Sequence, residues 1–314
     1  MKIAFLFPGQ GSQAAGMGKS LFEAFPESKA VFDAADRALG SSLSGLCFNG
    51  PEDDLKLTEN TQPALLATSI AALRALEGRG VKAEGVAGHS LGEYSALVAA
   101  NALNFDDAVR TVRLRGRYMQ EAVPAGRGAM AAILMLDADK VDEACREAAQ
   151  GEVVSPANLN CPGQIVIAGD AAAVDRAIAA CTARGAKRAI RLAVSAPFHC
   201  GLMKPAEVRL QVDLQGIHFG TATIPVYRNV DGAPQTSADA LRDGLVRQVS
   251  LPVQWQTTLE TMSADGFDTF IEVGSGTVVS GLVKKTVRGA RILNVEDPAS
   301  LEKTLQALQE TPRP

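Results

Sequence analysis

The chain has 314 residues, of which 46% are hydrophobic and 21% charged, and its formal net charge is −4. This composition is typical of a soluble globular enzyme with one large domain or two unequal ones. The charge excludes the strongly basic balance of nucleic-acid-binding and polybasic membrane-surface proteins. No apolar run approaches a membrane span, and the five cysteines are scattered without a C-x-x-C pair. We therefore expect a cytoplasmic protein with reduced thiols that binds neither nucleic acid nor membrane.

The first part of the chain alternates between predicted strands and helices. In chain order these are a strand over residues 2–7, a helix over 61–76, a strand over 84–88, and helices over 93–100 and 106–122. Pro8 and Gly9 end the first strand, and Asn104 is a suitable N-cap for the last of these helices. Alternation of this kind predicts an α/β protein whose parallel sheet is covered on both faces.

Residues 124–197 have a different pattern, which predicts a small inserted subdomain. The predicted strands cover 129–136, 153–160, 164–169 and 187–194, and the predicted helices cover 139–149 and 172–184. Their order, βαββαβ, is the ferredoxin-like arrangement. We therefore expect residues 1–123 and 198–314 to form the catalytic core, with residues 124–197 as a ferredoxin-like insert.

The last part of the chain returns to the pattern of the core. Strands are predicted over 267–273 and 291–295, and a closing helix over 298–309 begins after Asp297 as its cap. The tail from Thr311 to Pro314 is predicted to be disordered.

Gly88-His89-Ser90-Leu91-Gly92 matches G-x-S-x-G, a pattern that exposes a serine on a sharp turn between a strand and a helix. The glycines are needed because the backbone is strained there and a neighbouring Cβ would clash. The bare pattern is common by chance, and the alternative is a serine in an ordinary tight turn. The predicted strand before Ser90 and helix after it favour a nucleophile.

The loop after the first predicted strand, Gly9-Gln10-Gly11-Ser12-Gln13-Ala14, formally matches a dinucleotide-binding fingerprint. That fingerprint also needs an acidic residue at the end of a second strand, whereas Asp33 and Asp36 lie in a helical segment. The nucleotide interpretation therefore fails. A glycine-rich loop at the carboxyl end of a strand remains, where open α/β sheets bind ligands and where backbone amides can stabilise an oxyanion.

A nucleophilic serine needs a base, and the chain offers only His89, His199 and His218. His89 adjoins Ser90, and on a sharp elbow its side chain should point away from the serine. His218 has the sequence context of an edge or surface residue. His199 follows the insert where the chain re-enters the core, and elimination favours it as the base over a plain surface role. Cys200 beside it is better explained as a buried thiol than as a second nucleophile.

Arg115 is predicted to lie on the buried face of its helix. Arg110, Arg113 and Arg117 share one face, whereas Arg115 shares the opposite, apolar face with residues such as Met119. A buried guanidinium without a partner is costly, and the acids of the same helix lie elsewhere. Its partner is either a carboxylate from another segment or a carboxylate of the substrate.

Several motifs together resemble the malonyl-CoA:acyl-carrier-protein transacylase family. They are Phe7-Pro8-Gly9-Gln10-Gly11-Ser12-Gln13, Gly88-His89-Ser90-Leu91-Gly92-Glu93-Tyr94, Leu114-Arg115-Gly116-Arg117, Ser155-Pro156-Ala157-Asn158-Leu159-Asn160, Pro197-Phe198-His199, Pro252-Val253-Gln254-Trp255 and Glu272-Val273-Gly274-Ser275-Gly276. The similarity covers nearly the whole chain. It implies an α/β-hydrolase-like core with a ferredoxin-like insert, and neither a cofactor nor a metal, since the coenzyme A thioester is itself a substrate.

The resemblance also implies a role for each matching residue. Ser90 would be acylated, with His199 as its base and the Gln248 backbone carbonyl orienting the imidazole. The amides of Gln10 and Leu91 would form the oxyanion hole. Arg115 would bind the malonyl carboxylate, and Met119 and Asn160 would contribute to substrate binding.

The function expected on this basis is transfer of malonyl from malonyl-CoA to acyl carrier protein by a ping-pong mechanism. Three alternatives remain: a serine esterase or thioesterase on a similar core, a transferase subunit of a malonate decarboxylase complex, and a non-catalytic carrier-docking protein. Two basic clusters are candidate docking surfaces or merely solvated faces. They are Arg184, Lys187, Arg188 and Arg191 on the insert, and Lys284, Lys285 and Arg288 near a helix end.

Overall fold

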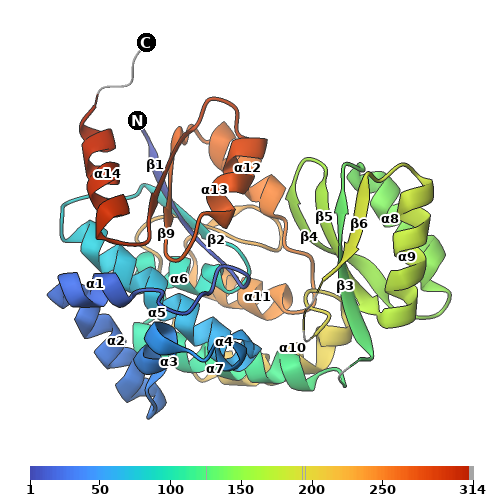
Figure 1. Cartoon of the computed structure of the whole chain (residues 1–314), viewed down its shortest axis with the longest axis horizontal. Helices are drawn as coiled ribbons and strands as arrows, with labels where there is room; N and C mark the ends of the chain where they lie inside the picture. The colour runs from blue at the N-terminus through green and yellow to red at the C-terminus, as the bar shows by residue number, and fades with distance from the viewer. Residues whose placement is uncertain (125, 193, 195, 311–314) are drawn as a thin grey trace.

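The computed structural model describes residues 1–124, 126–192, 194 and 196–310, and two β-sheets organise them (Figure 1). The main sheet has six strands in the order β10-β9-β1-β2-β7-β8. The strands are β1 (Ile3–Phe7), β2 (Gly85–Gly88), β7 (Val226–Tyr227), β8 (Pro234–Gln235), β9 (Thr269–Val273) and β10 (Arg291–Val295). Every neighbouring pair is parallel except β7 and β8, which confirms the predicted parallel core sheet. The predicted tail, 311–314, lies outside the described residues.

Helices flank this sheet, and the three with predicted bounds in the first half lie close to those bounds. They are α1 (Lys19–Ala24), α2 (Pro26–Leu39), α3 (Leu43–Asn49), α4 (Glu52–Lys56), α5 (Thr58–Glu77), α6 (Gly92–Ala99) and α7 (Phe105–Glu121). Helices α1, α3 and α4 were not predicted, because they have only five to seven residues each, and α2 was expected only as a helical segment around Asp33 and Asp36, without bounds. The predicted cap of α7 is confirmed, since the Asn104 side chain accepts a hydrogen bond from the Asp107 backbone N–H at 3.2 Å.

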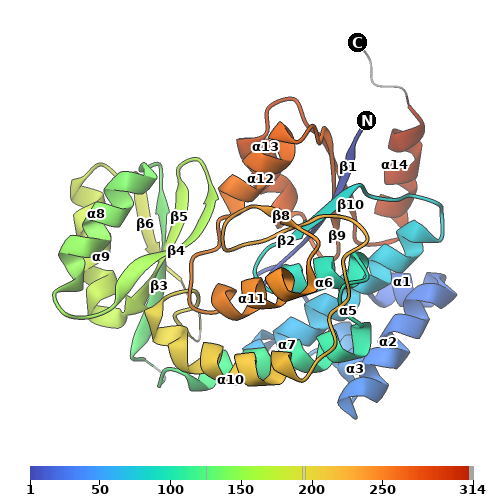
Figure 2. The same cartoon turned by 180° about the vertical axis from the view of Figure 1, so that it is seen from behind.

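The second half of the core adds helices that the sequence analysis largely missed. They are α10 (Lys204–Gln215), α11 (Ala238–Gln248), α12 (Trp255–Ala264), α13 (Val278–Thr286) and α14 (Pro298–Gln309), with a single 3₁₀ turn at Gly201–Met203. Figure 2 shows α10 and α11 on the side of the core that is turned away in Figure 1. Only α14 was predicted, and its cap is confirmed because Asp297 and Ser300 form a reciprocal capping box.

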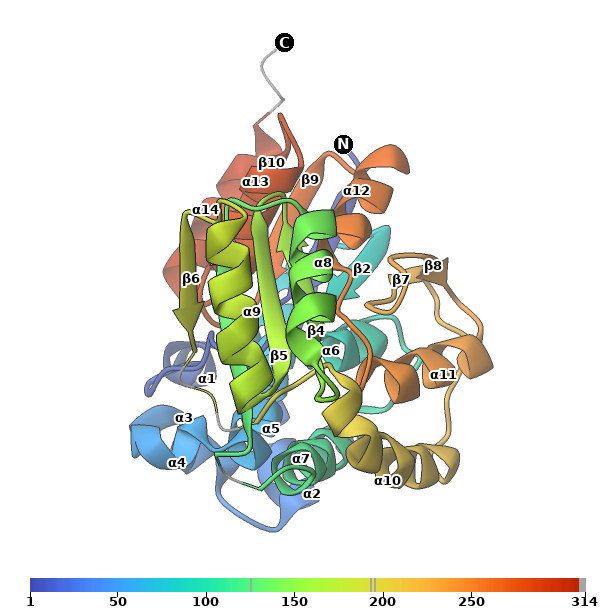
Figure 3. The same ribbon diagram turned by 90° about the vertical axis from the view of Figure 1, so that its right-hand side faces the viewer.

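The smaller sheet forms the predicted insert. Its elements are β3 (Gly128–Leu134), α8 (Ala138–Ala149), β4 (Val154–Cys161), β5 (Gln164–Asp170), α9 (Ala171–Ala183) and β6 (Arg188–Arg191). The strand order β4-β5-β3-β6 is antiparallel throughout. Helices α8 and α9 lie on its outer face (Figure 3). The βαββαβ order is therefore confirmed, although β6 is shorter than predicted and residue 193 of the predicted strand lies outside the described residues.

We propose the domain boundaries at 123/124 and 197/198. A separate apolar core, made by α8, α9 and the small sheet, lies entirely within the insert. The chain enters and leaves the insert at adjacent points, because a Cβ on Gly128 would lie 2.3 Å from Cγ of Pro197. Both observations support a unit inserted through two neighbouring connections.

The elbow after β2 packs directly on the end of β1, and this contact places the two loops side by side. A Cβ on Gly92 would lie 2.3 Å from the Phe7 carbonyl oxygen, and a Cβ on Gly88 would lie 1.9 Å from the Gly92 carbonyl. Only glycine fits at either position. Because β1 and β2 are parallel neighbours, Ser90 and the loop that carries Gln10 meet at one edge of the sheet.

Candidate active site

Ser90 occupies the turn between β2 and α6 with a φ of +52°, a left-handed conformation that is strained for a serine. A neighbouring side chain holds the turn. The Asn229 side-chain oxygen accepts a hydrogen bond from the Ser90 backbone N–H at 2.7 Å, and its amide nitrogen donates to the Gly88 carbonyl at 2.8 Å. The strained turn therefore presents the Ser90 hydroxyl in one direction.

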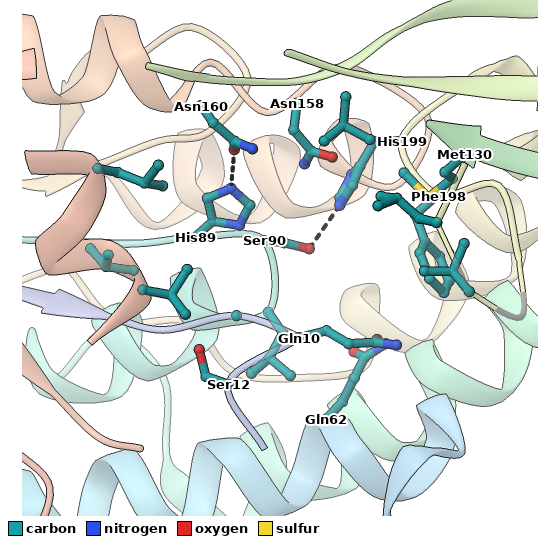
Figure 4. Close-up of a pocket in the computed structure, with 18 of the residues that line it drawn as sticks. Gln10, Ser12, Gln62, His89, Ser90, Met130, Asn158, Asn160, Phe198 and His199 are labelled. Atoms are coloured by element: carbon teal, nitrogen blue, oxygen red, sulfur yellow. Dashed lines mark hydrogen bonds between the residues drawn. The ribbon is translucent and has the colours of Figure 1, made fainter. Parts of the chain in front are cut away.

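His199 faces that hydroxyl, with its Nε2 2.7 Å from Ser90 Oγ (Figure 4). Its Nδ1 lies 2.8 Å from the backbone carbonyl oxygen of Gln248, which can only accept a hydrogen bond. Nδ1 must therefore carry the proton, and Nε2 of the neutral ring is left to accept from the serine. Burial, then the charge of Arg115, lowers the pKa of His199 to about 3. The ring is neutral at physiological pH.

Arg115 extends from α7 beneath the serine and is only 2% exposed. Its guanidinium donates to the side-chain oxygens of Gln62 at 2.7 Å and Gln248 at 2.8 Å, and to Ser90 Oγ at 3.2 Å. Among the described residues no carboxylate forms an ion pair with it, and its Nε has no partner. In the part of the chain that the structure describes, Arg115 therefore forms no direct ion pair with a carboxylate from another segment.

These groups border one cavity of about 210 Å³ between the core and the small sheet. The cavity is lined by most of the predicted site residues: Gln10, Ser90, Leu91, Arg115, Met119, Asn160 and His199. Gln248 lies behind the cavity, where it contacts His199 and Arg115. Within the described residues, the backbone N–H groups of Gln10 and Leu91 donate to no protein acceptor. They are therefore available to a ligand oxygen.

The other two histidines and the nearest cysteine are not placed to act on Ser90. His89 points away from the serine, as expected, and its Nε2 lies 2.8 Å from Asn160 Oδ1 (Figure 4). Its ring is edge-on to Trp255. His218 is exposed on a distant surface. Cys200 is buried, which raises the pKa of its thiol to about 12, and Sγ donates to the Pro197 carbonyl.

Sequence reasoning missed the side chains that hold the reacting residues. The Gln62 and Gln248 side chains position Arg115, and Asn229 positions Ser90. Gln62 gave a weak signal, because it is a polar residue at the start of an otherwise apolar helix. Asn229 gave none, because it reaches the elbow from a loop 139 residues further along the chain.

Two further observations concern metal binding and the membrane. The described part of the chain contains no cluster of histidine, cysteine and acidic side chains that could hold a metal ion. In the same residues, no helix has both the length and the apolar character needed to cross a membrane.

The fold and this site define an α/β protein in which a serine on a strand-to-helix turn is hydrogen-bonded to a buried histidine. Residues 4–308 match the family model for the acyl transferase domain, and the chain belongs to this family. It is 50% identical over 306 residues to the malonyl CoA-acyl carrier protein transacylase of Escherichia coli, covering 97% of this chain and 99% of the relative. It is also 50% identical over 310 residues to the enzyme of that name from Bacillus subtilis, covering 98% of each.

Solved structures agree with these relatives. An acyl carrier protein S-malonyltransferase from Vibrio cholerae superposes with a TM-score of 0.95 at 48% identity, over 97% of this chain and 100% of that one. A malonyl-transacylase in complex with its type II PKS acyl-carrier protein gives a TM-score of 0.95 at 49% identity, over 98% and 100%.

The environment of His199 predicts that its ring does not titrate in the usual histidine range. Because burial and Arg115 depress its pKa to about 3, the His199 ring should gain no proton between pH 8 and about pH 5, and burial also lowers the pKa of His89 from its ordinary value. NMR of protein labelled at the histidine rings, with His89→Gln and His199→Gln variants to assign the signals, will test this. A His199 signal that titrates near its ordinary value of about 6.5 would contradict the neutral-ring assignment.

Proposed function

We propose that this protein transfers a malonyl group from malonyl-CoA to the thiol of an acyl carrier protein through an acyl-serine intermediate. The observation that carries the proposal is the Arg115 guanidinium, which is buried against neutral amides 3.2 Å from the Ser90 hydroxyl. An acyl group attached to Ser90 that ends in a carboxylate would form an ion pair with this guanidinium. The function matches the names of the curated relatives over nearly the full length of the chain.

In the first half-reaction, Ser90 Oγ attacks the thioester carbonyl of malonyl-CoA while His199 Nε2 takes the hydroxyl proton. The oxyanion that forms would accept hydrogen bonds from the backbone N–H groups of Gln10 and Leu91, each donor being worth about 3 kcal/mol. The C–S bond then breaks, and His199 returns the proton to the departing coenzyme A thiolate. Malonyl remains as an ester on Ser90.

In the second half-reaction, the carrier thiol gives its proton to His199 and its sulfur attacks the ester carbonyl. The C–O bond breaks, Ser90 regains its proton, and malonyl leaves as a thioester. The partner of His199 is a neutral carbonyl rather than a carboxylate, so the imidazolium is less stabilised than in a serine hydrolase. A thiol is easier to activate than water, and this difference favours transfer over hydrolysis.

The substrate specificity assigned to Arg115 also fits its surroundings. A guanidinium presents parallel N–H donors that match a carboxylate, and the enclosed cavity strengthens such a pair. Acetyl would leave the buried charge without that partner. Met119 and Asn160, which also line the cavity, would contact the acyl group and the arm that carries it.

We also propose that the protein works in the cytoplasm. All five cysteines are free and buried in the structure, which is compatible with a reducing compartment.

The mechanism predicts that malonyl-CoA alone acylates the protein on Ser90. Intact mass and peptide mapping after incubation with malonyl-CoA should find one malonyl group on Ser90, which discharges when carrier protein is added. Cys200→Ala should be acylated normally, and His199→Ala should be acylated at least about 10²-fold more slowly. An adduct on another residue would refute the nucleophile assignment, and rapid discharge to water would support the esterase alternative.

Arg115→Ala should lose malonyl transfer and gain acetyl transfer in relative terms. Breaking a buried charged pair costs about 3 to 5 kcal/mol, so kcat/KM for malonyl-CoA should fall by at least about 10²-fold. Arg110→Ala, on the outward face of the same helix, is the matched control and should keep the malonyl preference. If Arg115→Ala still prefers malonyl strongly, another residue recognises the carboxylate.

One member of each basic cluster, Lys285 and Arg188, lies toward Gln164, which is at one rim of the cavity. Lys285 Nζ donates to Gln164 Oε1 at 3.0 Å, and Gln164 lines the cavity. Across the small sheet, Gln164 pairs with Leu134, which pairs in turn with Arg188. Two members of the insert cluster are already engaged, because Arg184 pairs with Glu147 and Arg191 with Asp175. The exposed residues Lys284, Lys285, Lys187 and Arg188 are therefore the preferred docking surface for an acidic carrier protein.

Charge reversal at this rim should weaken carrier binding without affecting acylation. Lys284→Glu with Lys285→Glu, and separately Lys187→Glu with Arg188→Glu, should raise the KM for carrier at low salt. The difference should shrink at physiological ionic strength, where the Debye length is about 8 Å. Lys303→Glu on α14 is the control. An unchanged carrier KM in both double variants at low salt would show that the carrier docks elsewhere.

A further inference from the structure

Glu93 is a fully buried acid that the mechanism above does not use. It lies in the first turn of α6, three residues after Ser90. Its Oε2 accepts hydrogen bonds from the Asn229 backbone N–H at 3.0 Å and from Gln248 Nε2 at 2.7 Å. Its Oε1 is buried without any partner in the described part of the chain. A carboxylate held in this way is stable either when a nearby charge balances it or when it is protonated.

The Gln248 side chain connects Glu93 to Arg115. Its amide nitrogen donates to the Glu93 carboxylate at 2.7 Å, and its amide oxygen accepts from the Arg115 guanidinium at 2.8 Å. The positive end of the amide dipole thus faces the Glu93 carboxylate, and the negative end faces the Arg115 guanidinium. The other cation near Glu93, Arg228, is already paired with Asp231. The charges of both arginines oppose the rise in the pKa of Glu93, Arg228 more than Arg115, but Arg115 is the one that is linked to Glu93 through an amide and has no carboxylate paired with it in the described residues.

We infer that Glu93 is the buried counter-charge of Arg115, relayed through Gln248, and that it takes up a proton when the substrate carboxylate binds Arg115. This inference rests on the proposed function, because it assumes that malonyl places its carboxylate on Arg115. Glu93 is a positioning residue, since it touches neither the substrate nor the reacting atoms.

The direction of the proton movement follows from the charges around Glu93. Without substrate, one cation and one anion face each other across Gln248. The malonyl carboxylate adds a second anion to a dry site, and a proton on the unpartnered Oε1 restores the balance. Burial already raises the pKa of Glu93 to about 7, so this proton costs little near neutral pH.

No other titratable group in contact with Glu93, Gln248 or Arg115 can take up a proton as readily when the substrate carboxylate binds. Tyr94, beside Glu93 on α6, has a raised pKa and stays neutral, and His199 has a pKa lowered to about 3. Strands β1 and β2, which also pack on α6, contain no charged residue. The charged residues of α5, Glu59, Arg74 and Glu77, are engaged in ion pairs that are partly exposed.

The inference predicts that malonyl-CoA binds more weakly as the pH rises above the pKa of Glu93. Binding favours the protonated acid, so affinity should be constant below about pH 6 and should then fall by up to tenfold per pH unit. Acetyl-CoA has the same nucleotide and phosphates but no acyl carboxylate, so its affinity should lack this fall. The Glu93→Gln change mimics the protonated acid and should abolish the pH dependence.

The experiment is calorimetric titration of the Ser90→Ala variant, which cannot be acylated, with malonyl-CoA and acetyl-CoA between pH 6 and pH 8.5. It is repeated on Ser90→Ala/Glu93→Gln, and on Ser90→Ala/Glu272→Gln as a matched control. Glu272 is another buried acid with a raised pKa, and it accepts backbone hydrogen bonds from α13 rather than facing Arg115. Buffers of different ionisation enthalpy give the number of protons taken up, expected to be about half a proton per site near pH 7.5.

The outcomes separate the two proposals. Equal affinity for malonyl-CoA and acetyl-CoA at every pH would overturn the assigned role of Arg115. A malonyl preference that is independent of pH, or that keeps its pH dependence in Ser90→Ala/Glu93→Gln, would overturn the inference about Glu93. If that double variant does not fold, proton uptake by Ser90→Ala decides the matter, because equal uptake with both thioesters contradicts the inference.

Discussion

The arrangement of the active site depends on one buried charge, the Arg115 guanidinium. Burying an arginine beside a nucleophile is costly unless its donors are satisfied, and here two glutamine side chains satisfy them without neutralising the charge. Gln62 comes from α5 and Gln248 from the end of α11, so this requirement fixes how three helices pack beneath the elbow. The same requirement leaves a positive charge at the floor of the cavity. The packing of these three helices and the positive charge in the cavity therefore both follow from the buried position of Arg115.

Gln248 connects this charge to Ser90 and His199. Its backbone carbonyl sets the tautomer of His199, while its side chain contacts Arg115, Glu93 and the Ser90 carbonyl. A shift of this residue would move His199, Arg115 and the elbow together. It belongs to the core, whereas the cavity wall opposite is built largely by the small sheet. The core thus holds the reacting groups, and the insert shapes the space above them.

The sequence predicted the elements whose evidence is local. The elbow, the capped helix α7 and the βαββαβ insert each have a pattern within a short stretch, and the buried face of α7 correctly placed Arg115 in the interior. His199 followed from elimination among three histidines. The short helices α1, α3 and α4 escaped because only one or two residues of each are buried. Asn229, Gln62 and the Glu93 network escaped because their contacts join segments far apart in the chain, and no local spacing records such contacts.

The burial of all five cysteines has a consequence for a protein whose reaction releases one free thiol and consumes another. Disulfide exchange needs an accessible thiolate, and the nearest cysteine to the base, Cys200, is held as a thiol by its surroundings. A coenzyme A or carrier thiol that enters the cavity in an oxidised, disulfide form therefore meets no cysteine that can attack it. Because every cysteine is buried and none lines the cavity, the protein is protected from being trapped as a mixed disulfide with its own substrates.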